Sequence, residues 1–294
     1  MIMSKNFVAT ILLLIGTAFW GITFVYVKEG ISIIDLYTFL AIRFIIGAVL
    51  LALIFVRRMR NFNIEILKYG IFLGLVLSFS YIAQTVGLQY TSASKAAFIT
   101  GLSVVFVPLF MSIFQKKAPA VNNIIAVFVA TIGLAILTLN TGFKLNVGDV
   151  WVFLCAILFA IYIILVGKYT RIFESIKFTV IQLVTVAVFT GIIAGFTNKI
   201  EIPRGYVVWH AILFCAVFAT AFMYAIQNQF QKFISEVKAA IIFSFEPLFA
   251  AVAAYYYLNE QITANIVTGG FLIFAGMIIS EIKWNYLVIK KRLD

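Results

Sequence analysis

One carboxylate lies deep inside an apolar stretch and is the first candidate for chemistry. Glu246 is about ten residues into the stretch 237–257, beyond the reach of water at either end, and Pro247 follows it. A charge at the centre of a membrane helix costs roughly 2.5–3.5 kcal/mol on insertion scales, so such a residue is a functional candidate by default. Proline removes a backbone N–H and frees a carbonyl one turn earlier. The pair predicts a broken helix with a cation-binding or protonation site; the alternative is a neutral Glu246 that serves packing.

Three cations join Glu246 as candidates. Arg43 lies about seven residues into the stretch 36–56, and it either snorkels outward, forms a fork for a substrate carboxylate, or pairs with Glu246. Lys95 and Lys238 begin two later stretches, where a cation opposes the helix dipole. They either snorkel at the interface or flank a cavity from opposite faces, where they would gate it or attract anions.

Polar and aromatic side chains in other stretches predict the walls of a binding cavity. Tyr81 and Gln84 are three residues apart, as are Tyr224 and Gln227, so each pair lies on one helix face. Two such faces predict a substrate with an apolar or aromatic part and a polar end. Interfacial anchoring or interhelical hydrogen bonding is the alternative for each of them. The predicted substrate-binding set also includes two further aromatic residues, Trp20 and Tyr162.

Few residues offer enzyme chemistry. The chain has one histidine, His210, and two cysteines, Cys155 and Cys215, which both lie in apolar stretches and are expected to be small buried hydrophobes. Covalent or metal catalysis needs a nucleophile with a base, or clustered ligands, and no phosphate-binding loop of the G-x-x-x-x-G-K-[ST] type is present. We therefore expect no catalytic residue, no metal, no cofactor and no direct use of ATP.

The composition identifies what positions these side chains. Of 294 residues, 64% are hydrophobic and 11% are charged, whereas soluble domains are about 45–50% apolar and roughly 25% charged. This excludes a soluble enzyme, a secreted disulfide scaffold and a disordered chain. The net charge of +11 is expected to reflect cytoplasmic loops rather than nucleic-acid binding.

The chain divides into ten stretches long enough to cross a bilayer, which takes about 20 apolar residues. They are 7–27, 36–56, 66–90, 93–114, 121–140, 148–167, 176–196, 207–230, 237–257 and 263–282. Continuous apolar runs exclude a β-barrel, whose strands alternate. Several helix starts carry side-chain oxygens suited to capping, at Asp35, Ser92, Ser94, Asp149 and Ser235.

The basic residues predict the orientation. If the N-terminus is cytoplasmic, 16 Lys and Arg fall inside, 5 fall outside, and Arg43 lies within the membrane. Basic residues concentrate in cytoplasmic loops. We therefore expect a multi-pass protein of the cell (inner) membrane with both termini in the cytoplasm.

An internal repeat divides the chain into two halves. Lys95-Ala96-Ala97 matches Lys238-Ala239-Ala240 at an offset of 143, which also carries Gly133 onto Gly276. Residues 19–28 lie over 159–168 at an offset of 140. Each half, 7–140 and 148–282, holds five stretches, and an odd number makes the halves enter from opposite faces. Inverted repeats with a site between the halves are typical of secondary transporters.

The sequence resembles the EamA group of the drug/metabolite transporter superfamily over about 9–281. The resemblance is carried by Phe19-Trp20-Gly21, Arg43-Phe44, the run from Gly87 to Phe98, Glu246-Pro247-Leu248-Phe249-Ala250, and Leu258-Asn259-Glu260. The family's usual glycine is Asn259 here, and Lys116-Lys117 stands at the equivalent place in the first repeat. The resemblance implies an inner-membrane permease, often an exporter of amino acids or metabolites.

These features predict an all-α membrane protein that exports small metabolites, in particular amino acids or related amphipathic compounds, by rocking of its two repeats. Its expected partners are a small-molecule substrate, the lipid bilayer and, through Glu246, protons as a coupling ion. An exchanger of nucleotide sugars or phosphate esters is the alternative within transporters, and a channel is the alternative outside them. The oligomeric state is not readable from the sequence, because lipid-facing and dimer-forming stripes have the same composition.

Overall fold

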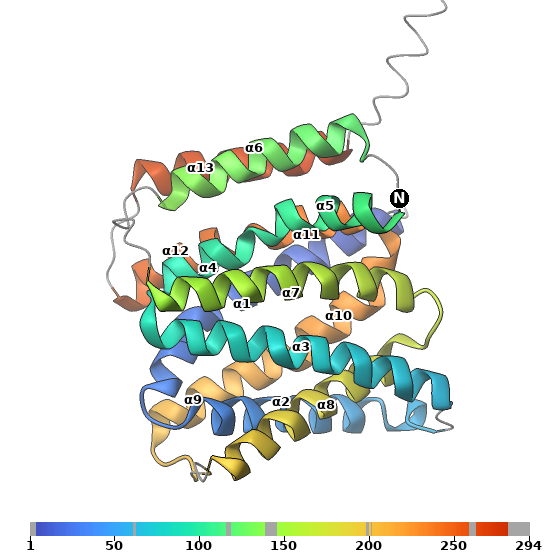
Figure 1. The fold of residues 1–294 in the computed structure, drawn as a ribbon, viewed down its shortest axis with the longest axis vertical. Helices are drawn as coiled ribbons and strands as arrows, with labels where there is room; N and C mark the ends of the chain where they lie inside the picture. Colours follow the sequence, from blue (N-terminus) through green and yellow to red (C-terminus); the bar gives the residue numbers. More distant parts are fainter. Residues whose placement is uncertain are drawn as a thin grey trace, which may run out of the picture.

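The computed structural model describes residues 4–60, 63–115, 119–138, 146–197, 200, 202–258 and 263–281, and each of the ten predicted stretches is helical in it. The first half contains α1 Lys5–Ile31, α2 Leu36–Ile54, α3 Ile64–Tyr90, α4 Ala93–Gly101, α5 Ser103–Gln115 and α6 Val121–Thr138. The second half contains α7 Val147–Tyr169, α8 Ser175–Phe196, α9 Tyr206–Phe214, α10 Met223–Phe230, α11 Glu236–Phe243, α12 Glu246–Leu258 and α13 Ala264–Glu281 (Figure 1).

Helix caps form at most of the predicted positions. The side chains of Asp35, Ser92 and Ser235 accept backbone N–H groups at the starts of α2, α4 and α11. Asp149 is the third residue of α7 and forms a capping box with Asn146. Ser94 was expected to cap as well, but it lies inside α4 because Ser92 already occupies the cap position.

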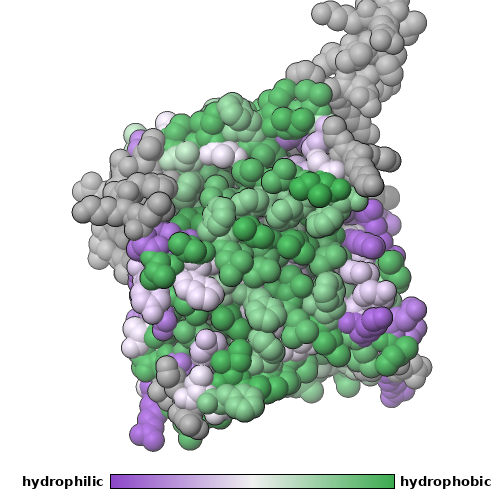
Figure 2. All heavy atoms as spheres, viewed as in Figure 1, coloured by the Kyte–Doolittle hydropathy of each residue, from purple (hydrophilic) through white to green (hydrophobic). Residues whose placement is uncertain are grey.

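The helices are those of a polytopic membrane protein. Within the described residues, eight helices or runs of consecutive helices are long and apolar enough to cross a bilayer, and α6 and α13 are shorter apolar helices. Hydrophobic side chains cover the broad face seen in Figure 2, and hydrophilic ones gather at its two lateral edges. The prediction of an all-α membrane protein is confirmed.

The two halves run in opposite directions through the bundle. Near the end of α1, Lys28 Nζ donates to the Thr91 carbonyl at 2.5 Å, and the Thr91 hydroxyl donates to Asp149 at the start of α7. At the other end, Lys5 of α1 lies over the Phe233 ring, close to the region where α7 ends. We call the end with Thr91 the outer end and the end with Phe233 the inner end. The repeat mates α1 and α7 thus cross the molecule in opposite senses (Figure 1).

The repeat is visible in the packing of the last helix of each half. α6 and α13 lie side by side (Figure 1). A Cβ added at Gly133 would lie 2.7 Å from the Gly269 carbonyl, and one at Gly276 would lie 2.8 Å from the Ala126 carbonyl. These contacts are reciprocal at the offset of 143, as a two-fold relation between the halves requires. The predicted inverted repeat is therefore present in the fold.

Three predicted stretches are not single α-helices. The fourth is divided into α4 and α5, the ninth into α11 and α12, and the eighth carries a π-helical segment, Cys215–Phe222, between α9 and α10. Irregular backbone at membrane depth is tolerated where protein surrounds it. Several basic residues used for orientation, and the motif residues Asn259 and Glu260, lie outside the described residues; the side of the membrane that each end faces stays a prediction.

Candidate functional site

Two broken helices meet near the centre of the bundle. α4 ends at Gly101 and α5 begins at Ser103, while α11 ends at Phe243 and α12 begins at Glu246. At the offset of 143, Ser103 and Glu246 are equivalent, so both halves break at the same place. Each break presents the N-terminus of a half-helix, with backbone N–H groups that lack intrahelical partners. Paired interruptions in corresponding segments mark the binding sites of transporters with inverted repeats.

Pro247 occupies the position that a half-helix tolerates. It lies in the first turn of α12, directly after Glu246. Its missing N–H would have no intrahelical acceptor there, so proline costs little. The sequence predicted a proline-broken helix at this point, and the structure places the break just before the proline.

A small cavity lies beside the second break. Its volume is about 20 Å³, enough for one water molecule and far too little for a metabolite. Four predicted site residues, Trp20, Tyr81, Gln84 and Glu246, line it. The remaining lining residues are Thr23, Ser80, Thr100, Cys155 and Phe159. The structure therefore represents a closed conformation of this site.

Glu246 is the charged group of the cavity. The residue is 5% exposed, and within the described part of the chain its carboxylate accepts no hydrogen bond and joins no ion pair. It stands at the N-terminus of α12, where the helix dipole favours a negative charge. A carboxylate placed in this way is available to a cationic group or a proton that enters the cavity.

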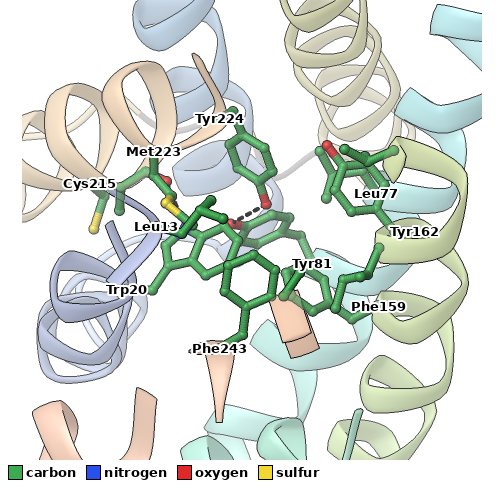
Figure 3. Close-up of a cluster of buried hydrophobic side chains, with 14 of the residues drawn as sticks. Leu13, Trp20, Leu77, Tyr81, Phe159, Tyr162, Cys215, Met223, Tyr224 and Phe243 are labelled. Atoms are coloured by element: carbon green, nitrogen blue, oxygen red, sulfur yellow. Dashed lines mark hydrogen bonds between the residues drawn. The ribbon is translucent and has the colours of Figure 1, made fainter. Parts of the chain in front are cut away.

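Trp20 and Phe159, which line the cavity together with Glu246, belong to a cluster of aromatic side chains that forms an aromatic wall (Figure 3). The Trp20 indole Nε1 donates to the Ala219 carbonyl at 2.9 Å, which fixes the ring. Around it, the ring centroids of Phe159, Tyr224 and Phe243 lie 5.3, 5.5 and 5.3 Å away. These separations are typical of favourable aromatic pairs. The wall therefore offers a fixed apolar surface beside the carboxylate.

The two tyrosines of the repeated motif contact each other. The Tyr224 hydroxyl donates to the Tyr81 hydroxyl at 2.8 Å, across 143 residues of sequence (Figure 3). Because this separation equals the repeat offset, the two residues are repeat mates, and the local two-fold axis passes between their hydroxyls. The sequence predicted two polar-aromatic faces around one cavity; the structure brings Tyr224 against Tyr81, but only the Tyr81 and Gln84 face lines the described cavity.

Arg43 is anchored inside the protein. It is 1% exposed, its Nε donates to Thr220 Oγ1 at 2.9 Å, and its Nη2 lies 3.5 Å from the Tyr81 hydroxyl. The guanidinium carbon is 4.9 Å from the centroid of the Tyr81 ring and 5.2 Å from that of Phe44. The outward snorkelling considered for Arg43 is wrong, because these contacts hold the guanidinium in the core. It also makes no ion pair with Glu246 among the described residues; the two share Tyr81 as a neighbour.

The predicted polar residues outside the cavity belong to interhelical networks. Tyr162 donates to Gln182 at 2.6 Å, and Gln182 donates to Asn228 at 3.2 Å. Gln227 donates to Gln231 at 3.0 Å, one turn along and away from the cavity. Tyr162 still adjoins the aromatic wall, with its ring 6.1 Å from that of Tyr224. Gln227 was predicted to bind substrate, but it does not line the described cavity.

The two repeat-mate lysines have different surroundings. Lys95 is 5% exposed, and its Nζ lies 2.6 Å from Asp149 Oδ2, forming a buried ion pair at the outer end. Lys238 is 6% exposed and lies at the inner end, where its backbone N–H is capped by Ser235. Neither lysine lines the cavity. Snorkelling into the interface is wrong for Lys95, because Asp149 holds it inside.

Several residues of the site were not predicted from the sequence. Thr220 anchors Arg43, and Asp149 pairs with Lys95, although the sequence indicated Asp149 only as a capping residue. Thr100 accepts a hydrogen bond from Gln84 at 3.3 Å. One signal was available: the offset of 143 relates Tyr81 to Tyr224, and a residue near a two-fold axis can meet its own mate. No sequence pattern indicates Thr220.

Comparison with known proteins gives a consistent result. The model of the EamA-like transporter family matches residues 8–139 and 146–281. An uncharacterized transporter of Archaeoglobus fulgidus is 29% identical over 280 residues, which cover 95% of this chain and 87% of that protein. The uncharacterized transporter YyaM of Bacillus subtilis is 27% identical, with 92% of each chain covered.

The fold is also found among solved structures. A crystal structure superposes on the chain with a TM-score of 0.76 at 14% identity, covering 97% of this chain and 98% of the other. At this identity the match bears on the fold alone. Because the family model matches nearly the whole sequence in two segments, the chain belongs to the EamA-like transporter family.

Proposed function

We propose that this membrane transporter is a secondary transporter that exports amino acids or related amphipathic amines by alternating access. The observation that carries the proposal is the pair of helix breaks at equivalent positions, with Glu246 and the Trp20 wall at one of them. Discontinuous helices at the interface of inverted repeats are where such transporters bind substrate and coupling ions.

The substrate class follows from the chemistry of the cavity. The Glu246 carboxylate suits an ammonium group, and Trp20 and Phe159 suit an apolar or aromatic side chain beside it. Aromatic faces also attract a cation that has been removed from water. Gln84 and Thr100 supply neutral polar groups for a carboxylate or carbonyl at the other end of the substrate.

Transport requires the cavity to enlarge toward each side in turn. At the outer end the Lys95–Asp149 pair closes the site, and it must separate or move when the path opens there. Lys238, its repeat partner, occupies the equivalent place at the inner end. We assign gating to these two lysines. The substrate is released at the end of the molecule where the helices that carry the gating lysine have separated from their neighbours.

Glu246 also supports coupling to protons. A charged carboxylate in the bilayer interior is costly, whereas a protonated one is not. Binding of a cationic substrate and binding of a proton would then compete for one group, which exchanges the two across the membrane. The positions of the basic residues support an orientation with cytoplasmic termini in the cell membrane.

The competing functions need features that the site lacks. A nucleotide sugar or phosphate ester calls for several cations at the substrate, and none of the residues that line the described cavity is Lys or Arg. A channel needs a continuous path, and its flux would not saturate with substrate concentration. Saturable flux with counter-transport distinguishes a transporter from a channel.

Reconstituted protein provides the decisive experiment. Amino acids and small amines are screened by thermal shift, and each stabilising compound is tested for uptake and counterflow in proteoliposomes. Glu246→Gln is expected to abolish flux driven by a proton gradient, while Glu65→Gln, which neutralises an exposed carboxylate at the start of α3, retains it. Unchanged gradient-driven flux in Glu246→Gln refutes the coupling role, and a screen without any stabilising amine refutes the substrate class.

A further inference from the structure

An apolar groove on the outside of the bundle lies apart from the transport site. It runs between α3 and α8, which pack against each other on the face seen in Figure 1. Its volume is about 600 Å³. The two walls are formed by aliphatic side chains that repeat every four residues, Leu67, Ile71 and Leu75 on α3 and Val184, Val188 and Ile192 on α8.

The depth of the groove results from close packing beneath it. A Cβ added at Gly70 would lie 2.7 Å from Ile181 Cγ2, and one at Gly74 would lie 2.5 Å from the Thr185 Cβ. The helices thus approach closely along Gly70 and Gly74, whose four-residue spacing is a pattern that allows close packing in membranes. Bulkier side chains on either side of the contact then stand above it as walls. Gly191 and Gly195 have the same spacing on α8 but make no such approach among the described residues.

The length of the groove matches one leaflet of a bilayer. On α8 its lining residues extend from Val180 to Ile192, which is about 18 Å at 1.5 Å per residue. Half of a hydrocarbon core of about 30 Å is roughly 15 Å. Both helices begin at the inner end. On α3 the lining residues, Leu67 to Leu75, stay in the first half of the helix, and on α8 they extend past its middle. The groove therefore starts in the leaflet at the inner end and reaches the centre of the bilayer.

Basic side chains gather where the groove reaches the inner end. Lys68 follows the lining residue Leu67, and Lys177 lies one turn before Val180. Lys177 Nζ donates to the Arg60 carbonyl at 2.6 Å, which holds the α2–α3 connection against the start of α8. Arg58 is tied to the same place, 3.5 Å from Glu174.

The charge at this end remains positive after its carboxylates are counted. Glu174 pairs with Arg58 and caps α8 at the Lys177 backbone N–H, and Glu65 lies exposed in the first turn of α3. A third carboxylate, Glu236, lies 3.5 Å from Arg171. Against these three acidic residues stand six basic residues in the same connections and first turns: Arg57, Arg58, Arg60, Lys68, Arg171 and Lys177. Basic pockets between helices on the cytoplasmic side are suited to anionic headgroups.

We propose that this groove is a binding site for an anionic phospholipid. One acyl chain lies between α3 and α8, and the headgroup phosphate is held by Lys68 and the cations around Lys177. A zwitterionic lipid fills the groove equally well but gains less from the basic cluster, so the site selects for headgroup charge. The site is independent of the substrate cavity and of the proposed transport function.

The test is a titration of detergent-purified protein with phosphatidylglycerol and with phosphatidylcholine of the same acyl chains. Bound lipid is counted by native mass spectrometry, and thermal unfolding is followed in parallel. Phosphatidylglycerol is expected to bind more tightly and to raise the unfolding temperature. A basic residue near an anionic surface contributes about 1 kcal/mol, so Lys68→Gln and Lys177→Gln should each weaken binding of phosphatidylglycerol about fivefold.

Two further variants separate the site from general effects. Arg204→Gln removes an exposed cation at the other end of the bundle and should leave lipid binding unchanged. Val188→Trp fills the groove from a half-exposed position and should weaken both lipids alike. Equal binding of the two lipids, or unchanged binding in Lys68→Gln and Lys177→Gln, overturns the proposal. A dimer that forms through the groove and is disrupted by Val188→Trp, without selective lipid binding, would assign it to a second copy of the chain instead.

Discussion

The helix breaks of the two repeats occupy equivalent positions but carry different side chains. α5 begins with Ser103, whereas α12 begins with Glu246, and only the second break lies on the described cavity. The carboxylate that pairs with Lys95 is not repeated either: the repeat offset of 140 places Ala9 at the position equivalent to Asp149. The backbones of the two halves are therefore related by two-fold symmetry, whereas the carboxylates Glu246 and Asp149 are not repeated.

This difference indicates separate roles for the symmetric backbone and for the side chains that are not repeated. Symmetric helices allow the halves to exchange conformations, as alternating access requires. A substrate has no two-fold axis, so the groups that bind it need not be repeated. The residues that break the symmetry, Glu246 and Asp149, are accordingly the first to alter in order to test the comparison.

The largest effect is expected at the outer ion pair. Lys95→Met leaves Asp149 buried without its partner, and breaking a buried pair in this way costs about 3–5 kcal/mol. Thermal unfolding in detergent should show a marked loss for Lys95→Met and a smaller one for the double variant Lys95→Met/Asp149→Asn, which removes both charges. If Lys95→Met is as stable as the wild type, the Lys95–Asp149 ion pair does not stabilise the outer end and the predicted difference between the two ends is wrong.

A swap between the breaks tests whether they are interchangeable. Glu246→Ser is expected to lower substrate flux roughly 10- to 100-fold, because a hydrogen bond to a charged group contributes about 1.5–3 kcal/mol. Ser103→Glu/Glu246→Ser should not recover it, since Ser103 does not line the cavity that Trp20 and Phe159 share with Glu246. Flux in proteoliposomes measures both variants, with Ser103→Ala as the control. Recovery in the double variant would show that the two breaks are chemically equivalent.

The anchor of Arg43 should give an intermediate effect. Thr220→Val removes the acceptor of the Arg43 Nε hydrogen bond, and an unsatisfied buried donor costs about 1–3 kcal/mol. Thr190→Val is the matched control, because the Thr190 hydroxyl donates to the Val186 and Ala187 carbonyls of its own helix. Equal unfolding temperatures for the two variants would contradict an anchoring role for Thr220.

The smallest effect is expected at the two-fold axis itself. Tyr224→Phe removes the hydrogen bond to Tyr81 and should cost about 1 kcal/mol. Tyr81→Phe should cost more, because Tyr81 also lies beside Arg43. The double variant should cost less than the sum, since both changes remove the same bond. Additive losses in thermal unfolding would show that the tyrosines do not act as a pair.

Sequence patterns predicted the parts of the site that depend on local chemistry. Glu246 stood out because a carboxylate inside an apolar run is costly wherever the helix packs. Tyr81 and Gln84 were found from their spacing, which places them on one helix face. The spacing did not distinguish Gln84, which lines the cavity, from its mate Gln227, which does not. The rotation of a helix against its neighbours decides which side chains line the cavity. This rotation leaves no periodic pattern in the sequence of a helix that is apolar on every side.

The sequence by itself determined the ten helical stretches, most of their caps, the repeat and the single deep carboxylate. Each of these depends on hydropathy or on hydrogen bonds within a few residues. Only the tertiary structure decided that Arg43 bonds Thr220, that Lys95 meets Asp149 and that Tyr81 meets Tyr224. Those pairs join residues 177, 54 and 143 positions apart, and their geometry is set by how helices cross, because a buried polar group is stable only where packing brings it a partner.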